Sequence, residues 1–167
     1  MTGFGTQKRS QTSLLRANGG QAVDFLMSKN ETPMTEGFWR SHAKGTFLAE
    51  YPLVRRRGTE CTGRWADAII LPDEPYCRGS VEDYPSLAGR KVIVVQTKCE
   101  RMGMYLMGQA LFSGRLVKSQ GAKSVRSILL CLQTDSALLP LLKEFSEVEV
   151  WISDEENPRK CARVIIE

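Results

Sequence analysis

RWADAIILPD, from Arg64 to Asp73, and VIVVQTKCERMGMYLMGQALFSGRL, from Val92 to Leu116, are the two stretches that decide the fold of this chain. Each contains an apolar run of the length of a buried β-strand, and the second run leads into a helical pattern. Successive side chains of a strand point to opposite faces, so Gln96 and Lys98 are expected to share a face. If the two strands pair, one face of the sheet gathers Asp67 with Gln96 and Lys98.

The polar side chains of these strands interrupt runs that are otherwise apolar. On the first strand, Asp67 is expected to share the face of Trp65 and Ile69. An ionised carboxylate and an ammonium group are costly in such strands, because buried charges require a partner, a metal or a function. Each residue also has a structural explanation: Asp67 can accept backbone amides, Gln96 can bridge strands, and Lys98 can reach solvent. Together, in this order, the three residues predict a functional site.

An Asp followed on the next strand by Glu-x-Lys is the signature of the PD-(D/E)xK nuclease superfamily, and this chain resembles that superfamily from about Thr32 to Asp154. Gln96 stands where the family carries Glu, and similar Asp and Gln-x-Lys pairs occur in the Mrr-type restriction endonucleases. Some branches carry Gln-x-x-x-Tyr on the following helix. Here Gln109 is followed at that spacing by Ser113, so this second motif matches in part.

The resemblance implies an α/β fold of the α+β mixed-sheet kind, with a restriction-endonuclease-like core. Its order is helix, three-stranded meander, helix, strand, helix, strand, and hydrophobic periodicity along the chain predicts the same succession. Residues 72–89 are rich in turn formers and acids and are expected to form a long surface loop. The expected helices cover 32–44, 103–119 and 137–147, and the expected strands cover 46–54, 64–71, 91–98, 127–133 and 148–153, with a final edge strand within 157–167.

The length of 167 residues indicates one domain that can bury a core without disulfides or metals. Residues 1–20 are polar and are expected to form a flexible N-terminal segment, while residues 21–167 form a single nuclease-like domain that opens with a helical turn at Ala22 to Ser28. No apolar run is long enough for a membrane span or a signal peptide, so a soluble cytoplasmic protein without membrane contact is expected. Five scattered cysteines and one histidine, His42, disfavour disulfides and structural zinc.

Positive charge is concentrated in the first part of the chain. Residues 1–64 carry 10 Lys or Arg against 5 acids, and the remainder carries 13 against 14, so the two parts are +5 and −1 within a net charge of +4. The arginines Arg55, Arg56, Arg57 and Arg64 are expected to attract the phosphates of a nucleic acid, with DNA as the favoured partner. The alternative for this cluster is a solvated hairpin tip.

Hydrolysis of a phosphodiester requires an activated water and neutralisation of the charge that builds on the phosphate, and a bound Mg²⁺ or Mn²⁺ supplies both. The expected metal ligands are the carboxylate of Asp67, the amide oxygen of Gln96 and the backbone carbonyl of Thr97. Lys98 is expected to orient the attacking water or stabilise the developing charge.

A second acid completes the expected catalytic set of Asp67, Gln96 and Lys98. Glu36 is the acid within the expected first helix, and Glu50 on the following strand is its alternative. An acid in the first turn of a helix is also favoured by the helix dipole alone, which leaves a structural role open for Glu36.

The sequence therefore predicts metal-dependent hydrolysis of nucleic acid. The alternative is a catalytically inactive nuclease-like module that binds nucleic acid or a protein partner, with Gln96 marking a lost site. A nucleotide-binding α/β protein is disfavoured, because neither a Walker loop nor GxGxxG follows any strand. The sequence leaves a homodimer open and does not decide the biological context.

Overall fold

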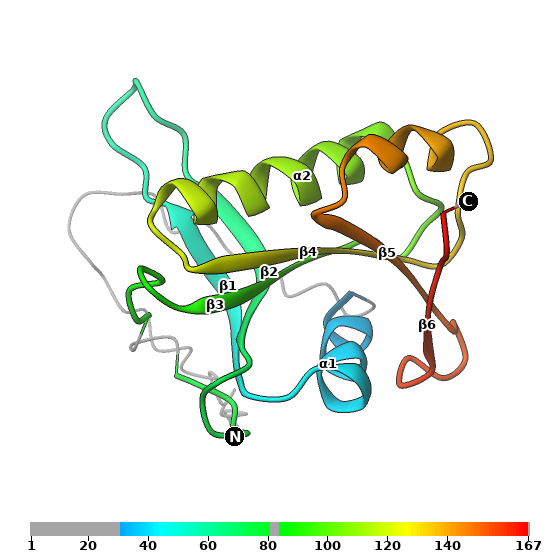
Figure 1. Cartoon of the computed structure of the whole chain (residues 1–167), viewed down its shortest axis with the longest axis horizontal. Coiled ribbons are helices and arrows are strands. Elements are labelled where there is room, and N and C mark those ends of the chain that lie inside the picture. Colours follow the sequence, from blue (N-terminus) through cyan, green and yellow to red (C-terminus); the bar gives the residue numbers. More distant parts are fainter. Residues whose placement is uncertain (1–30, 81–83, 167) are drawn as a thin grey trace, which may run out of the picture.

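A six-stranded mixed β-sheet with helices on both faces organises the chain (Figure 1). The computed structural model describes residues 31–80 and 84–166, so the predicted flexible segment 1–20 and the predicted helical turn at 22–28 lie outside the described residues. The elements along the chain are α1 (Glu31–His42), β1 (Thr46–Val54), β2 (Arg64–Leu71), β3 (Lys91–Thr97), α2 (Met104–Ser119), β4 (Ser124–Cys131), the 3₁₀ helix η1 (Leu139–Glu144), β5 (Val148–Ser153) and β6 (Cys161–Arg163).

The strands lie in the sheet in the order of the sequence, from β1 to β6. The pairs β1–β2 and β2–β3 are antiparallel and form the predicted meander, whereas β3–β4 and β4–β5 are parallel. Parallel neighbours require a crossover connection, and α2 supplies it between β3 and β4. The last strand, β6, returns antiparallel to β5 as a short edge.

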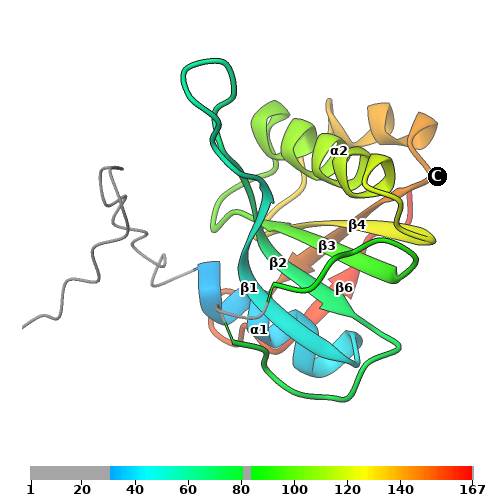
Figure 2. The same ribbon diagram turned by 90° about the vertical axis from the view of Figure 1, so that its left-hand side faces the viewer.

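The two faces of the sheet carry different layers (Figures 1 and 2). On one face, α1 buries Met34, Phe38 and Trp39 against side chains of the strands, among them Ile70 and Val95. On the other face lie α2 and η1, which cover two further apolar clusters. The sheet is therefore apolar on both sides, which explains why β3 reads as an unbroken apolar run rather than an alternating one.

Several predicted boundaries differ from the structure. The helix α1 begins at Glu31, one residue before the predicted start, and β4 begins at Ser124 rather than 127. The predicted helix over 137–147 is the short 3₁₀ helix η1, in which Pro140 has no amide proton to donate. Within the predicted loop, Arg78 forms an isolated bridge with Phe47 of β1. Along the described residues, no helix combines the length and the apolar content that crossing a bilayer requires.

Two glycines of α2 provide a test of how closely this helix packs on the sheet. A Cβ atom at Gly114 would lie 1.9 Å from the Oγ of Ser127 on β4, whereas one at Gly108 would meet nothing within 4 Å. We expect Gly114→Ala to lower the free energy of unfolding by about 1–3 kcal/mol through overpacking. Gly108→Ala should raise it by about 0.5–1 kcal/mol, because alanine favours helix. Urea unfolding of both variants measures the two changes, and equal signs would contradict the packing described.

Candidate functional site

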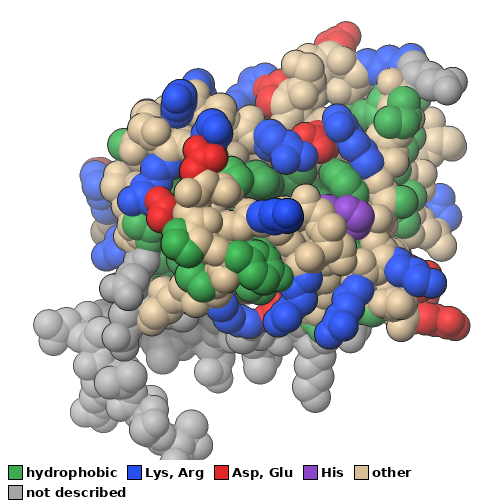
Figure 3. Space-filling model, turned by 60° about the horizontal axis from the view of Figure 1, so that its bottom comes forward, with side chains coloured by type: hydrophobic (Ala, Val, Ile, Leu, Met, Phe, Trp, Pro, Cys, Tyr) green, Lys and Arg blue, Asp and Glu red, His purple; other side chains and the backbone are tan. Residues whose placement is uncertain are grey.

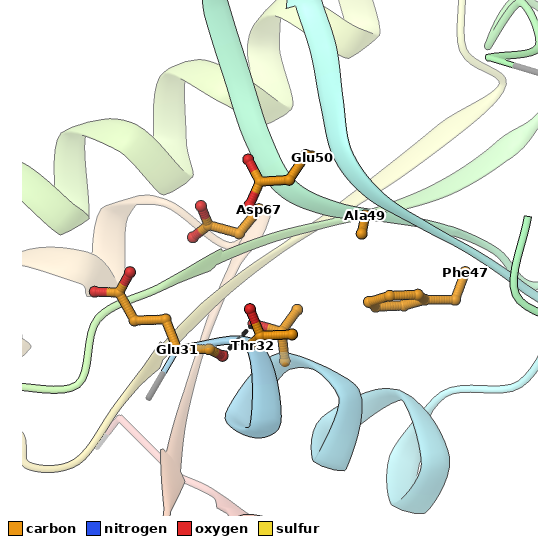
Figure 4. Close-up of a pocket in the computed structure, with 7 residues that line it drawn as sticks. Glu31, Thr32, Phe47, Ala49, Glu50 and Asp67 are labelled. Atoms are coloured by element: carbon orange, nitrogen blue, oxygen red, sulfur yellow. Dashed lines mark hydrogen bonds between the residues drawn. The ribbon is translucent and has the colours of Figure 1, made fainter. Parts of the chain in front are cut away.

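A small acidic pocket lies where the first turn of α1 faces β1 and β2 (Figure 4). Its volume of about 20 Å³ admits a water molecule or a bare ion and excludes an organic ligand. Three carboxylates from three different elements contribute to it, and they are those of Glu31, Glu50 and Asp67. The remaining lining residues are Thr32, Thr35, Phe47 and Ala49.

Asp67 reaches this pocket because the alternation of side chains breaks in the middle of β2. Ala68 belongs to the core under α1, whereas Ala66 and Ile69 belong to the core on the α2 side. Asp67 lies at this break and lines the pocket beside α1. The prediction that Asp67 shares a face with Ile69 is therefore wrong, because a strict period of two does not hold between these two residues.

The break coincides with an unusual backbone conformation at Glu50 of β1. Its φ of 49° lies in the left-handed region, and every other described residue in that region is a glycine. The residues on either side of Glu50 are paired with the residues on either side of Asp67, so the two acids lie opposite one another. Left-handed backbone at a residue other than glycine is costly and gathers at functional sites. The strain therefore supports a functional reading of this pair.

The electrostatic surroundings of Asp67 raise its pKa to about 7. Burial is the largest cause, and the nearby carboxylates of Glu50 and Glu31 raise it further, whereas a hydrogen bond from the backbone amide of Thr97 lowers it. That hydrogen bond runs from the Thr97 nitrogen to Asp67 Oδ2 at 2.6 Å and ties β2 to the end of β3. Burial and the charge of Glu31 also raise the pKa of Glu50. Burial, more than neighbouring charge, therefore favours the protonated form of both carboxyl groups.

Lys98 lies beside the acidic pocket, directly after the end of β3. Its ammonium group donates a hydrogen bond of 2.9 Å to Glu31 Oε1, and this contact raises the pKa of Lys98. Lys98 is the first residue after β3, so the alternation of the strand no longer fixes its direction. Lys98 therefore contacts the pocket only through Glu31, which lines it together with Asp67.

Gln96 lies on the other side of the sheet, which corrects the prediction that it joins Asp67 and Lys98 on one face. Its amide nitrogen donates to Ser113 Oγ of α2 at 2.8 Å and to the carbonyl oxygen of Trp65 at 3.1 Å. The side chain is only 1% exposed. The alternation of β3 holds up to this position, and it directs Gln96 toward α2. Its predicted role as a metal ligand finds no support in this geometry.

The second acid of the site is Glu31, which the sequence analysis missed. It selected Glu36, but the carboxylate of Glu36 forms ion pairs with Arg40, at 3.7 Å, and with Arg78. These contacts lie away from Asp67. Glu31 was missed because Pro33 suggested that the helix starts at Thr32. The signal that could have identified Glu31 is its position directly before that predicted start. The alternative, Glu50, is the predicted acid that the structure does place in the pocket.

The remaining predicted residues lie outside the pocket. Arg55, Arg56 and Arg57 are exposed on the hairpin between β1 and β2, which projects beyond the sheet (Figure 2). The guanidinium of Arg64 donates to the carbonyl oxygens of Thr62 and Gly63, at 3.1 Å each. On α2, Gln109 is half-buried, and it is Ser113 that contacts the motif, through Gln96.

Oxygen donors from Asp67, Glu50 and Glu31 are of the chemical type that Mg²⁺ prefers. In residues 31–80 and 84–166, however, no three His, Cys, Asp or Glu side chains already stand in an arrangement that could hold a metal ion. A cation bound beside Asp67 would favour the ionised carboxylate and lower its raised pKa. The donor atoms are therefore of a type that suits a divalent metal, but the three carboxylates are not already arranged around one, and Gln96 lies outside the set.

Asp67→Asn tests whether the buried carboxylate destabilises the fold. Because the folded pKa is raised, the stability that protonated Asp67 contributes is present below pH 3.8 and is lost as the pH rises through about 7. Asparagine carries no charge and its oxygen can still accept from Thr97. We expect the variant to be more stable than the wild type at pH 8, at about 1.4 kcal/mol per pKa unit removed, and similar at pH 4. Urea unfolding across this range, with exposed Asp73→Asn as the control, measures it; a gain that is independent of pH would contradict the assignment.

Gln96→Glu distinguishes a structural from a metal-binding role at position 96. A carboxylate cannot donate to the carbonyl oxygen of Trp65, and leaving a buried group unpaired costs about 1–3 kcal/mol. We expect a loss of stability of this size and no gain in Mg²⁺ affinity by calorimetry. Gln133→Glu is the matched control, because that exposed amide accepts a hydrogen bond from Arg101 through its oxygen. Tighter Mg²⁺ binding by Gln96→Glu would support the prediction that residue 96 is a metal ligand.

Comparison with known proteins adds no relative: no protein-family model, no curated protein and no solved structure matches this chain. The functional assignment therefore has to come from the geometry and chemistry of the acidic pocket.

Proposed function

We propose that the protein is a divalent-metal-dependent nuclease that hydrolyses phosphodiester bonds of DNA, built on a restriction-endonuclease-like core. The observation that carries the proposal is the convergence of Asp67, Glu50 and Glu31 with the ammonium of Lys98. Carboxylates and a lysine at one strand end are the groups that phosphodiester hydrolysis requires. The succession of α1, the meander, α2 and the parallel strand β4 supports the same fold proposal.

The carboxylates of Asp67 and Glu50 are the groups that would hold Mg²⁺ or Mn²⁺, with Glu31 at the edge of the pocket. A bound metal would supply an activated water and neutralise charge on the scissile phosphate. Thr97 orients Asp67 through its backbone amide, and its carbonyl lies at the same strand end. Asp67 has to lose its proton to serve as a ligand, so metal binding to the free protein should strengthen as the pH rises through about 7.

Lys98 acts on the phosphate rather than on the metal. Its ammonium is half-buried and held by Glu31, so it is positioned before substrate arrives. A fixed positive charge next to the reacting phosphate stabilises the charge that develops during attack. Glu31 therefore has two functions in this proposal, as a possible oxygen donor and as the residue that fixes Lys98.

In this proposal, the projecting hairpin also contacts the DNA substrate. Arg55, Arg56 and Arg57 stand exposed on it, and none of them forms an ion pair with a described residue. Unpaired guanidinium groups are suited to the phosphate backbone, whose binding is dominated by charge. The hairpin would then hold duplex DNA at a distance from the pocket.

Cleavage assays test the nuclease directly. Plasmid, linear duplex and single-stranded DNA are incubated with the protein in Mg²⁺, in Mn²⁺ or in chelator. We expect metal-dependent cleavage that Asp67→Asn abolishes and that Lys98→Ala lowers by about 10²-fold or more, the scale of losing one positioned electrostatic group. Glu31→Gln should lower turnover, whereas its matched control on the same helix, Glu36→Gln, should leave it unchanged.

Two outcomes would count against the enzyme. Cleavage that persists in excess chelator, or in Asp67→Asn, would show that the pocket is not where the reaction occurs. A folded wild type that binds DNA but cuts none of the substrates would favour the alternative, a catalytically inactive nuclease-like module. The direction of Gln96 favours that alternative, because the position that the family uses for an acid faces α2 here.

A further inference from the structure

An exposed tyrosine is held against α1 at some distance from the acidic pocket. Tyr76, in the loop between β2 and β3, is 56% exposed, and its ring stacks on that of Trp39 with the centroids 4.8 Å apart and the planes at 27°. Trp39 also stacks on Phe47, at 4.9 Å. Because Phe47 lines the acidic pocket, a series of aromatic rings leads from the pocket wall to the surface.

Hydrogen bonds on both sides of Tyr76 fix the loop that carries it. The hydroxyl of Thr46 donates to the carbonyl oxygen of Pro75 at 2.9 Å. The backbone of Phe47 donates to the carbonyl oxygen of Cys77 at 2.9 Å and accepts from the amide of Gly79 at 2.8 Å. A side chain that is already ordered loses little conformational freedom when it binds a ligand. Tyr76 is therefore a preorganised contact and not a residue on a free loop.

Two arginines lie over the aromatic rings of the series that ends at this tyrosine, and Figure 3 shows Lys and Arg side chains on the face of the molecule that α1 covers. The guanidinium of Arg40 lies 5.4 Å from the Trp39 ring centroid, and that of Arg78 lies 5.7 Å from the Phe47 ring centroid. Both pair with the single carboxylate of Glu36, which cannot neutralise two charges.

One further cation extends the charge beyond this shared pair. Lys44 is exposed and forms no ion pair with any residue in 31–80 or 84–166. It directly precedes Gly45, whose carbonyl oxygen accepts a hydrogen bond of 3.0 Å from the indole of Trp39. We call Tyr76 with Arg40, Lys44 and Arg78 the Tyr76 surface.

We infer that the Tyr76 surface binds a single-stranded segment of nucleic acid. An unpaired base stacks on the open face of Tyr76, and the phosphates on either side lie against the cations. Aromatic side chains combined with a positively charged groove are the means by which proteins bind single strands without reading sequence. A duplex offers no free base face to Tyr76, because its bases are stacked on one another.

The position of this surface relates it to the pocket without depending on catalysis. Trp39 follows Glu31 by eight residues on the same helix, which is about 12 Å along the axis at 1.5 Å per residue. A strand that lies along α1 would reach from Tyr76 to the acidic pocket. The inference goes beyond the proposed nuclease, since binding at Tyr76 requires neither a metal nor cleavage.

Fluorescence anisotropy with a labelled oligo-dT and with a duplex of equal length tests this inference. The measurements are made in chelator and on the Asp67→Asn background, so that cleavage cannot contribute. We expect Tyr76→Ala to weaken binding of the single strand by about 5- to 100-fold, the range of losing one stacked base, and to leave duplex binding nearly unchanged. Tyr76→Phe should keep the affinity, because it keeps the ring.

The matched control is Tyr105→Ala, whose side chain is 75% exposed on α2 across the sheet and should not affect binding. Tyr76→Leu keeps an apolar side chain over Trp39 but provides no aromatic face for a base. It therefore distinguishes a loss of base stacking from a loss of protein stability. We expect it to bind the single strand as weakly as Tyr76→Ala. Lys44→Ala should flatten the log-log salt dependence by about 0.7, the change for one lost phosphate contact on a single strand.

Three results would overturn the inference. The first is single-strand affinity in Tyr76→Leu equal to that of Tyr105→Ala, with both variants folded by thermal denaturation. The second is an equal loss of duplex affinity, which would indicate general attraction by charge. The third is tight binding of an acidic peptide with no oligonucleotide binding, which would assign the surface to a protein partner. Because all arms are read in chelator, a failure of the nuclease assay leaves each of them measurable.

Discussion

The hydrogen bond from the amide of Thr97 to Asp67 Oδ2 is the contact on which the rest of the site depends. It joins the middle of β2 to the end of β3, where the chain leaves the sheet toward α2. A carboxylate that accepts a backbone amide is fixed in direction but keeps its second oxygen for another partner. The same bond opposes the effect of burial on the pKa of Asp67, so it also limits how far the carboxyl is driven toward its neutral form.

Periodicity and turn chemistry predicted most of the sheet. The strands β1, β2 and β5 have the predicted bounds, because each is an apolar run that ends at turn-forming residues. The mixed sheet and the meander also agree with the prediction. The boundaries that failed lie where local patterns compete. Around Pro140, an apolar helical spacing was read as a full helix, whereas the structure forms only the short 3₁₀ helix η1 with Pro140 in its first turn.

The site was predicted only in part, and each failure has a physical cause. Asp67 lines the pocket and Lys98 contacts it through Glu31, and the alternation of strands accounts for neither position. Asp67 turns toward α1 at a break that accompanies the left-handed backbone of Glu50, and no sequence rule places a glutamate there. Gln96 obeys the alternation and for that reason points to Ser113. Alternation describes the side chains of the regular strand β3, whereas it fails at the break beside Glu50 and at Lys98, which follows the end of the strand.

The loop segment from Cys77 to Gly79 has a consequence for how the molecule behaves in a crowded solution. By pairing with Phe47 it covers part of the outer rim of β1, which would otherwise offer open amides and carbonyls to a neighbouring chain. Gly79 allows this close approach, since a Cβ atom there would lie 2.3 Å from a methyl group of Leu48. At the opposite rim, β6 is only three residues long and leaves little template. Both borders of the sheet are therefore poor seeds for strand-to-strand aggregation, and the chain achieves this without closing the sheet into a barrel.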